Sequence, residues 1–140
     1  MSGEFQISTD KTQLDINLIA DYLLNEAYWS KGRSLELVEK SIEHSLCFGV
    51  YTQEGQQLAF ARIVTDYVVF AWIMDVFVID KFKGKGVGKL LIDYMMRYPD
   101  LKNVKGMGLR TEDAQGFYEK FGFGTILEPE TWMFKRNRNI

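Results

Sequence analysis

The sequence has a single cysteine, a single histidine and no long uninterrupted apolar run. The lone Cys47 cannot close an internal disulfide, and because it lies in the apolar run LCFGVY we expect a packed thiol in a reducing interior. The lone His44 has no companion ligands, which argues against a metal site. No charged start leads into a signal segment, and no apolar run approaches the ~18 residues of a membrane helix. These absences predict a cytoplasmic protein with no membrane partner.

The length and charge of the chain narrow its class further. Its 140 residues, 46% of them hydrophobic, predict one compact domain over residues 1–140. The formal net charge of -2 argues against a general nucleic-acid binder. Lysines nevertheless gather in KFKGKGVGK, residues 81–89, and this local excess of positive charge predicts an anionic ligand.

Hydrophobic periodicity predicts a mixed α+β fold. The order β-α-α-β-β-β-α-β-α-β favours a mixed, mostly antiparallel central sheet with helices packed against it. Ser34 is the predicted cap of the second helix, Asp113 that of the last helix, and Gly122 the left-handed residue that ends it. The predicted elements cover residues 4–9, 14–27, 35–46, 47–52, 58–65, 70–79, 86–96, 106–110, 114–121 and 132–135.

A glycine-rich turn between the strand over 70–79 and the following helix predicts a phosphate site. The first turn of a helix presents unpaired N–H groups and a partial positive charge, and glycine lets a phosphate approach the backbone closely. The alternative is a loop with glycines for geometry and solvated lysines. A nucleotide P-loop does not fit, because Lys83 stands in place of its glycine and Leu90 in place of its hydroxyl residue. The dinucleotide fingerprint lacks its third glycine.

This turn resembles the acyl-coenzyme A site of the GNAT superfamily of N-acetyltransferases. The family pattern is Arg or Gln, two residues, Gly, one residue, then Gly or Ala, after a strand that ends apolar-x-Val. The sequence VFV, residues 76–78, precedes Lys83, Gly86 and Gly88 in those places. A second motif about 30 residues later, DAQGFYEKFGF, matches the family at Ala114, Tyr118, Gly122 and Phe123. Lysine at 83, Asp80 for proline and Thr111 for asparagine depart from the pattern.

The resemblance implies acetyl-coenzyme A as cosubstrate, without a metal. It assigns the oxyanion donor to a backbone N–H near Val78 and the general acid to Tyr118, whose ordinary pKa near 10 keeps it protonated. The alternative for Tyr118 is a core tyrosine. The expected contacts of the coenzyme are Val76, Phe77, Val78, Lys83, Gly84, Lys85, Gly86, Val87, Gly88, Lys89, Thr111, Asp113, Ala114, Phe117 and Tyr118.

An acid inside the strand over 70–79 is the candidate base. By the two-residue period Asp75 shares a face with Ile73 and Phe77, where an unpaired carboxylate would be costly. It is therefore a candidate to deprotonate the acceptor amine. The alternatives are a salt bridge with Arg62 of the preceding strand, or binding of the acceptor by the pair.

The acceptor is the least defined part of the predicted function. The expected acceptor wall comprises Tyr28, Trp29, Arg33, Arg62, Asp66 and Tyr67. For Tyr28, Trp29 and Arg33 the alternative is ordinary packing and a solvated arginine. We expect an N-acetyltransferase that acts on a primary amine of a small acceptor in a ternary complex, and a homodimer is left open. The alternatives are a non-catalytic coenzyme A sensor, and a protein whose lysine loop binds phosphorylated partners.

Overall fold

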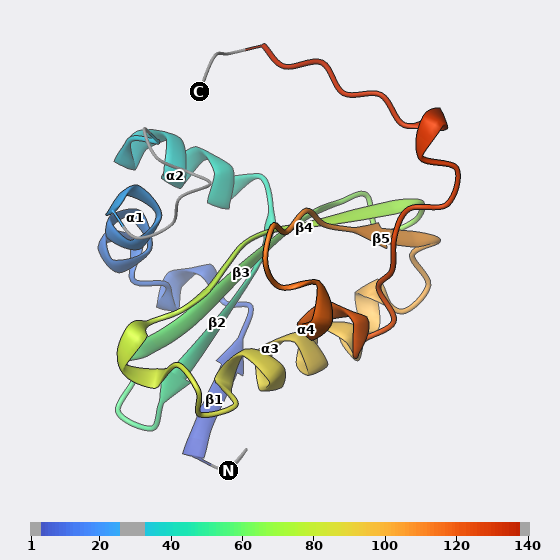
Figure 1. Cartoon of the computed structure of the whole chain (residues 1–140). Coiled ribbons are helices and arrows are strands. Elements are labelled where there is room, and N and C mark those ends of the chain that lie inside the picture. Colours follow the sequence, from blue (N-terminus) through green and yellow to red (C-terminus); the bar gives the residue numbers. More distant parts are fainter. Residues whose placement is uncertain (1–3, 26–32, 138–140) are drawn as a thin grey trace. The chain divides into compact units, whose positions relative to one another are not determined.

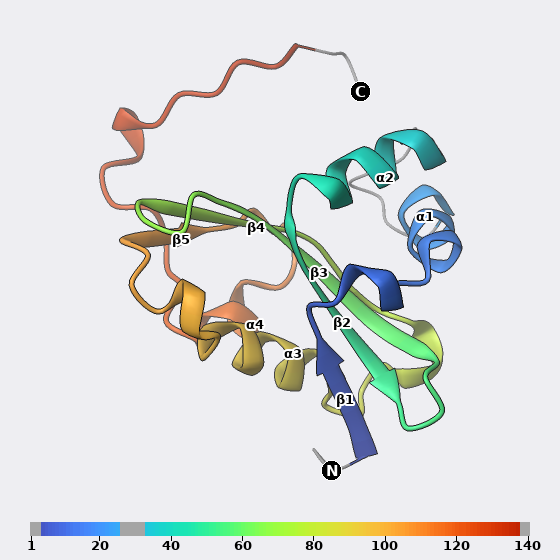
Figure 2. The ribbon, with the colours of Figure 1, turned by 180° about the vertical axis from the view of Figure 1, so that it is seen from behind.

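The computed structural model describes residues 4–25 and 33–137 (Figures 1 and 2). Contacts divide the chain into two compact units, Met1–Arg110 and Thr111–Ile140. The first unit contains the sheet and the helices that cover it, and the second contains a short helix and the C-terminal segment. A single domain over residues 1–140 stays a prediction.

The first unit is built on a five-stranded mixed sheet whose strands follow chain order. The first four strands pair antiparallel, and the last pairs parallel with its neighbour. This arrangement confirms the predicted α+β fold with a mixed, mostly antiparallel sheet. The strands are β1 Phe5–Ser8, β2 Leu46–Thr52, β3 Gln57–Thr65, β4 Phe70–Val78 and β5 Gly106–Gly108.

Helices cover both faces of this sheet. Helices α1, Ile16–Asn25, and α2, Leu35–Glu43, lie on one face, and α3, Val87–Met96, lies on the other (Figures 1 and 2). The Ser34 hydroxyl accepts a hydrogen bond from the Leu37 N–H at 3.3 Å, which confirms the predicted cap of α2. Helix α2 ends before the predicted residue 46, because the chain turns and enters β2 there.

Each face of the sheet has its own apolar layer. Ile73, Asp75 and Phe77 of β4 are all buried, as the sequence predicted. The predicted common face is wrong for Ile73, because β4 has an extra residue between Met74 and Phe77. Phe77 pairs with Phe60 of the layer under α1 and α2, whereas Ile73 pairs with Ile63 on the opposite face of the sheet. Each fully buried aliphatic or aromatic side chain stabilises the fold by about 1.5–3 kcal/mol. The layer under α1 and α2 comprises Leu14, Ile19, Leu23, Val38, Ile42, the free thiol Cys47, Phe60 and Phe77. The layer under α3 is built on Val87, Leu91, Ile92 and Met95.

The second unit contains α4, Gln115–Glu119, and a 3-10 turn, Pro129–Thr131. Gly122 has a φ of 96°, which confirms the predicted left-handed residue after the helix. Ala114, and not Asp113, is the cap of α4, and its N–H donates to the Thr111 hydroxyl at 3.1 Å. The strand predicted over 132–135 is wrong, because no strand forms there among the described residues and the Met133 and Phe134 side chains are 95% and 82% exposed.

Candidate active site

The turn after β4 has the backbone geometry of an anion cradle. A 3-10 turn, Asp80–Phe82, follows β4, and two glycines then adopt left-handed conformations, Gly84 with φ 78° and Gly86 with φ 82°. A Cβ atom at either position would meet no atom within 4 Å, so the space beside the turn is open. Only glycine takes these φ values without strain, which explains the glycine pattern of the sequence.

The start of helix α3 supplies donors to this open space. Gly86 is the cap of α3, and the first hydrogen bond of the helix runs from the Leu90 N–H to the Gly86 carbonyl at 3.0 Å. The N–H groups of Val87, Gly88 and Lys89 precede that bond, so they have no acceptor within the helix. Together with the helix dipole they form a site that favours a phosphate.

The lysines of the turn have interaction partners within the protein, which the sequence did not suggest. The Lys83 ammonium pairs with Asp80 at 2.9 Å and lies 5.9 Å from the ring centre of Tyr22, while the Lys85 ammonium lies 5.3 Å from the ring centre of Phe82. A hydrogen bond to Asp80, and a second to Tyr22, raise the pKa of Lys83. These exposed lysines therefore supplement the backbone donors.

Tyr22 of α1 is a residue of this site that sequence reasoning missed. Its ring stacks on Phe77 of β4, with ring centres 4.2 Å apart and planes 11° apart. Because it also meets Lys83, it joins helix α1, the end of β4 and the glycine turn. Its position in the helical repeat indicates only that it lies beside the apolar side of α1. No local feature of the sequence marks it as a residue of the site.

Strands β4 and β5 part early, and this leaves an open strand edge. They pair only at Phe70–Trp72 with Gly106–Gly108, while β4 continues against β3 to Val78. Beyond Trp72 the other edge of β4 has no strand partner among the described residues. Backbone groups on an unpaired strand edge are available to an extended ligand.

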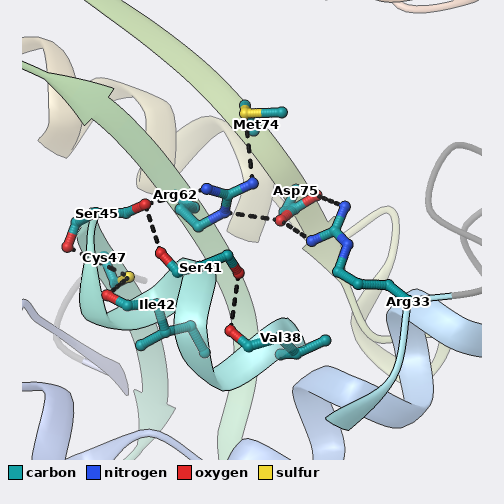
Figure 3. A network of polar contacts seen from close by, with 9 residues as sticks. All are labelled: Arg33, Val38, Ser41, Ile42, Ser45, Cys47, Arg62, Met74 and Asp75. Carbon is teal, nitrogen blue, oxygen red and sulfur yellow. Dashed lines mark hydrogen bonds and ion pairs between the residues drawn. The ribbon is translucent and has the colours of Figure 1, made fainter. Parts of the chain in front are cut away.

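A bulge in β4 changes the direction in which the side chain of Asp75, the candidate base, points. Phe60 pairs with Phe77 and Arg62 pairs with Met74, so β4 has one residue more than β3 in this interval. Asp75 lies in the bulge and has a φ of 55°, a left-handed conformation that costs a non-glycine residue about 1–3 kcal/mol. The bulge turns its carboxylate toward the chain that enters α2 (Figure 3).

Two arginines hold the Asp75 carboxylate. Arg33 donates to both of its oxygens, at 2.6 and 3.1 Å, and the Arg62 Nε donates to Oδ2 at 2.8 Å (Figure 3). Arg62 also donates to the Ser45 hydroxyl at 3.0 Å and to the Met74 sulfur at 3.4 Å. The predicted salt bridge between Asp75 and Arg62 is therefore present, and Arg33 is a second partner that the sequence did not suggest for it.

The electrostatics of this cluster lower the basicity of Asp75. Burial alone raises the pKa of the carboxyl, but hydrogen bonds and charge from Arg33 and Arg62 outweigh burial and hold the pKa below its ordinary value. A carboxylate with a lowered pKa is a weaker proton acceptor. A catalytic role of Asp75 stays a prediction.

The remaining predicted acceptor residues divide into two groups. Tyr28 and Trp29 lie outside the described residues. Asp66 and Tyr67 lie in the turn before β4, where the Asp66 carboxylate accepts from the N–H groups of Val68, Val69 and Phe70. These hydrogen bonds lower the pKa of Asp66. This turn is at the opposite end of β4 from the glycine turn, and Asp66 has a turn-forming role there. An acceptor role of Asp66 and Tyr67 stays a prediction.

Tyr118 lies in α4 of the second unit, among aromatic rings. Its ring meets those of Phe117 and Phe123 edge-on, with centres 5.0 and 6.0 Å apart. Burial raises the pKa of the Tyr118 hydroxyl, so the group is protonated at neutral pH. This is the state that a proton donor needs.

The described part of the chain shows neither a metal cluster nor a membrane span. No group of three or more His, Cys, Asp or Glu side chains suited to a metal occurs among residues 4–25 and 33–137. None of the helices in these ranges combines the length and hydropathy of a membrane-crossing segment.

Comparison with known proteins gives the family. The family model of the acetyltransferase (GNAT) domain matches residues 43–125. A crystal structure of a protein assigned to the GNAT acetyltransferase family, from Xanthomonas campestris pv. campestris, is 42% identical over 94% of this chain and 92% of that chain, with a TM-score of 0.91. The chain therefore belongs to the GNAT family of acetyltransferases, and the family implies acetyl-coenzyme A as cosubstrate.

Two curated relatives are more distant. A protein of Gibberella zeae that is assigned as an acetyltransferase is 25% identical over 86% of this chain and 79% of its own length. A chloroplastic protein of rice, Oryza sativa subsp. japonica, named as a serotonin N-acetyltransferase, is 29% identical over 85% of this chain and 61% of its own length.

Replacement of Asp75 by Asn tests the ion-pair cluster. At neutral pH the free energy of unfolding is expected to fall by about 3–5 kcal/mol, because two guanidinium groups lose their buried counter-charge. The folded-state pKa of Asp75 is below its unfolded value, so its stabilisation is complete above the unfolded pKa and is lost as the pH falls through the folded pKa. The difference between wild type and variant should therefore shrink in acid, measured by urea titration at several pH values.

The matched control is Asp93→Asn, which breaks an exposed pair between Asp93 of α3 and Arg97, the residue that follows the helix. It should cost no more than about 0.5 kcal/mol. A difference between wild type and Asp75→Asn that is independent of pH down to acid would contradict the assigned pairing.

Proposed function

We propose that the chain transfers the acetyl group of acetyl-coenzyme A to the primary amine of a small acceptor, by direct attack within a ternary complex. The glycine turn carries the proposal, because Gly84 and Gly86 leave open space in front of the unbonded amides at the start of α3. The fit is to a pyrophosphate, the group that a coenzyme A molecule presents to a helix N-terminus.

Each part of the cosubstrate has a proposed partner on the chain. The amides of Val87, Gly88 and Lys89 bind the pyrophosphate, with Lys83 and Lys85 beside them. The open edge of β4 from Val76 to Val78 holds the acyl arm by its backbone, and an N–H near Val78 donates to the oxygen that becomes negative during transfer. Thr111, Asp113, Ala114 and Phe117 are the proposed contacts in the second unit.

The acceptor must reach the thioester as a free amine. An amine with the lysine pKa of about 10.4 costs about 4.6 kcal/mol to deprotonate at pH 7. Of the roles open to Asp75, pairing with the two arginines is favoured over that of base, because both carboxylate oxygens accept guanidinium hydrogen bonds. The leaving thiolate needs a proton, and Tyr118, protonated at neutral pH, is the proposed donor. The name of the rice relative specifies a small primary amine, which supports the same acceptor class here.

Thiol release from acetyl-coenzyme A across a panel of primary amines tests the proposal. Release that depends on one class of amine, with an N-acetylated product identified by mass spectrometry, is the expected result. Tight binding of acetyl-coenzyme A in calorimetry without turnover on any amine would instead support a non-catalytic sensor.

Replacement of Gly88 by Val tests the cradle. The branched side chain would intrude on the pyrophosphate beside the helix amides, so the Kd of acetyl-coenzyme A in calorimetry should rise on the order of 10-fold or more, as expected for the loss of one charged hydrogen bond. Gly88 is a better choice than Gly86, where the left-handed φ would strain any valine.

Gly106→Val is the control for this substitution. Gly106 begins β5, and a Cβ atom there would meet nothing within 4 Å, so binding should be unchanged. The cradle is wrongly assigned if folded Gly88→Val protein binds acetyl-coenzyme A as tightly as wild type.

Replacement of Tyr118 by Phe tests the proton donor. The ring and its packing remain while the hydroxyl is lost, so coenzyme binding should be unchanged and kcat should fall by about 10²–10⁴-fold. The defect should be smaller with an acyl donor whose thiol has a lower pKa, because that leaving group needs less protonation. Stopped-flow measurement of thiol release gives the rate of the chemical step.

The control for this variant is Tyr94→Phe, which removes a hydroxyl from the aromatic group around Phe48 in the first unit. Its rate should match wild type. An equal rate in Tyr118→Phe would leave this tyrosine as a packing residue.

A further inference from the structure

The ion-pair cluster of Asp75, Arg33 and Arg62 has a net positive charge. Arg33 and Arg62 both pair with the one carboxylate, so the three groups sum to a formal charge of +1. Among the described residues, their other hydrogen-bond partners are the Ser45 hydroxyl and the Met74 sulfur, and both are neutral. No other acidic side chain among the described residues forms an ion pair with either arginine. One arginine would have sufficed to neutralise Asp75.

This surplus charge is shielded from water. The Asp75 side chain is 1% exposed, that of Arg62 is 8% exposed and that of Arg33 is 20% exposed. A charge in such a place is costly unless it is paired. The segment 26–32, outside the described residues, contains one acid, Glu26, and one base, Lys31, so its formal charge is zero.

The two guanidinium groups also retain hydrogen-bond donors. Each arginine has five N–H groups. Arg33 uses two of them on Asp75, and Arg62 uses one each on Asp75, Ser45 and Met74. The rest have no partner among the described residues. Guanidinium N–H groups match the paired oxygens of a carboxylate or a phosphate.

The cluster lies next to the proposed acyl site. Asp75 directly precedes Val76–Val78, and a strand rises about 3.3 Å per residue, so its Cα lies about 10 Å from that of Val78. The strained φ of Asp75 fixes the carboxylate that orients both arginines. An anion held here would be separated by only a few bonds from an amine at the thioester.

We propose that Arg33 and Arg62 form an anion subsite, so that the acceptor is a small amine that carries its own carboxylate or phosphate. The inference rests on the proposed acetyl transfer and adds the chemical class of the acceptor. The acceptor's anion neutralises the surplus charge of the cluster. The same positive charge disfavours the protonated form of the nearby amine, which helps to present it as a nucleophile.

Matched acceptors test this without any change to the protein. Amino acids, each beside its own carboxamide, form the carboxylate arm, and 2-aminoethyl phosphate beside ethanolamine forms the phosphate arm. In at least one arm, kcat/KM for the anionic member should exceed that for its neutral partner by about 10-fold or more. The carboxamide amine is the less basic one, so a preference for the acid cannot arise from a larger fraction of free amine. Equal or better turnover of the neutral members in both arms overturns the subsite while leaving acetyl transfer intact.

An Arg33→Gln variant connects the preference to the cluster. It removes the surplus charge but leaves Arg62 paired with Asp75, so the ratio of anionic to neutral kcat/KM should fall about 10-fold, mainly through KM. The matched control is Arg97→Gln, which replaces an exposed arginine directly after α3 and should leave the ratio unchanged. Thermal melts and calorimetry with acetyl-coenzyme A check that both variants fold and bind. A preference that persists in folded Arg33→Gln protein overturns the assignment.

A binding measurement separates this inference from the proposed function. N-acetylated amino acids and N-acetylated 2-aminoethyl phosphate are titrated into wild type saturated with coenzyme A, beside their neutral analogues. If an anionic product binds wild type and its affinity falls about 10-fold in Arg33→Gln, the subsite is supported, even if no amine is turned over. Absence of turnover on every amine would count against acetyl transfer alone. Equal binding of anionic and neutral products overturns the subsite.

Discussion

The loss of the β5 partner after Trp72 is the constraint on which the proposed site depends. A central strand normally satisfies its backbone on both edges, and then no ligand can bind along it. Here β4 keeps β3 on one edge up to Val78, and beyond Trp72 its second edge has no strand partner in the part of the chain that the structure describes. The glycine turn and helix α3 follow directly in the chain, so the open edge and the unbonded helix amides are adjacent by connectivity.

A second constraint is the bulge that carries Asp75. It costs backbone strain, and it turns a carboxylate from the middle of an apolar strand toward two arginines. Burial of these three charges without one another would be strongly unfavourable, so the pairing fixes the chain before α2 against β3 and β4. Stability alone requires one arginine, and the second one gives the cluster its positive charge.

Much of the fold could be predicted because it follows from local periodicity. The two-residue period predicted the burial of Ile73, Asp75 and Phe77, although the bulge puts Ile73 and Phe77 on opposite faces, and Ser34 marked the start of α2. The errors occurred where local preference met tertiary context. Residues 132–135 have the composition of a strand, but a strand exists only if another strand pairs with it, and in the described residues none does.

The sequence by itself determined the glycine turn, because left-handed φ values at 84 and 86 are a property of the residues that hold them. It also determined the family, through two motifs of contiguous residues. Only the tertiary structure decided between the alternatives for Asp75 and added Arg33 to its partners. Arg33 is 42 residues away in the chain, and the bulge shifts Arg62 opposite Met74. Such contacts depend on strand register and on the path of the chain between helices, which are set by packing of the whole unit and leave no signal in the neighbouring residues.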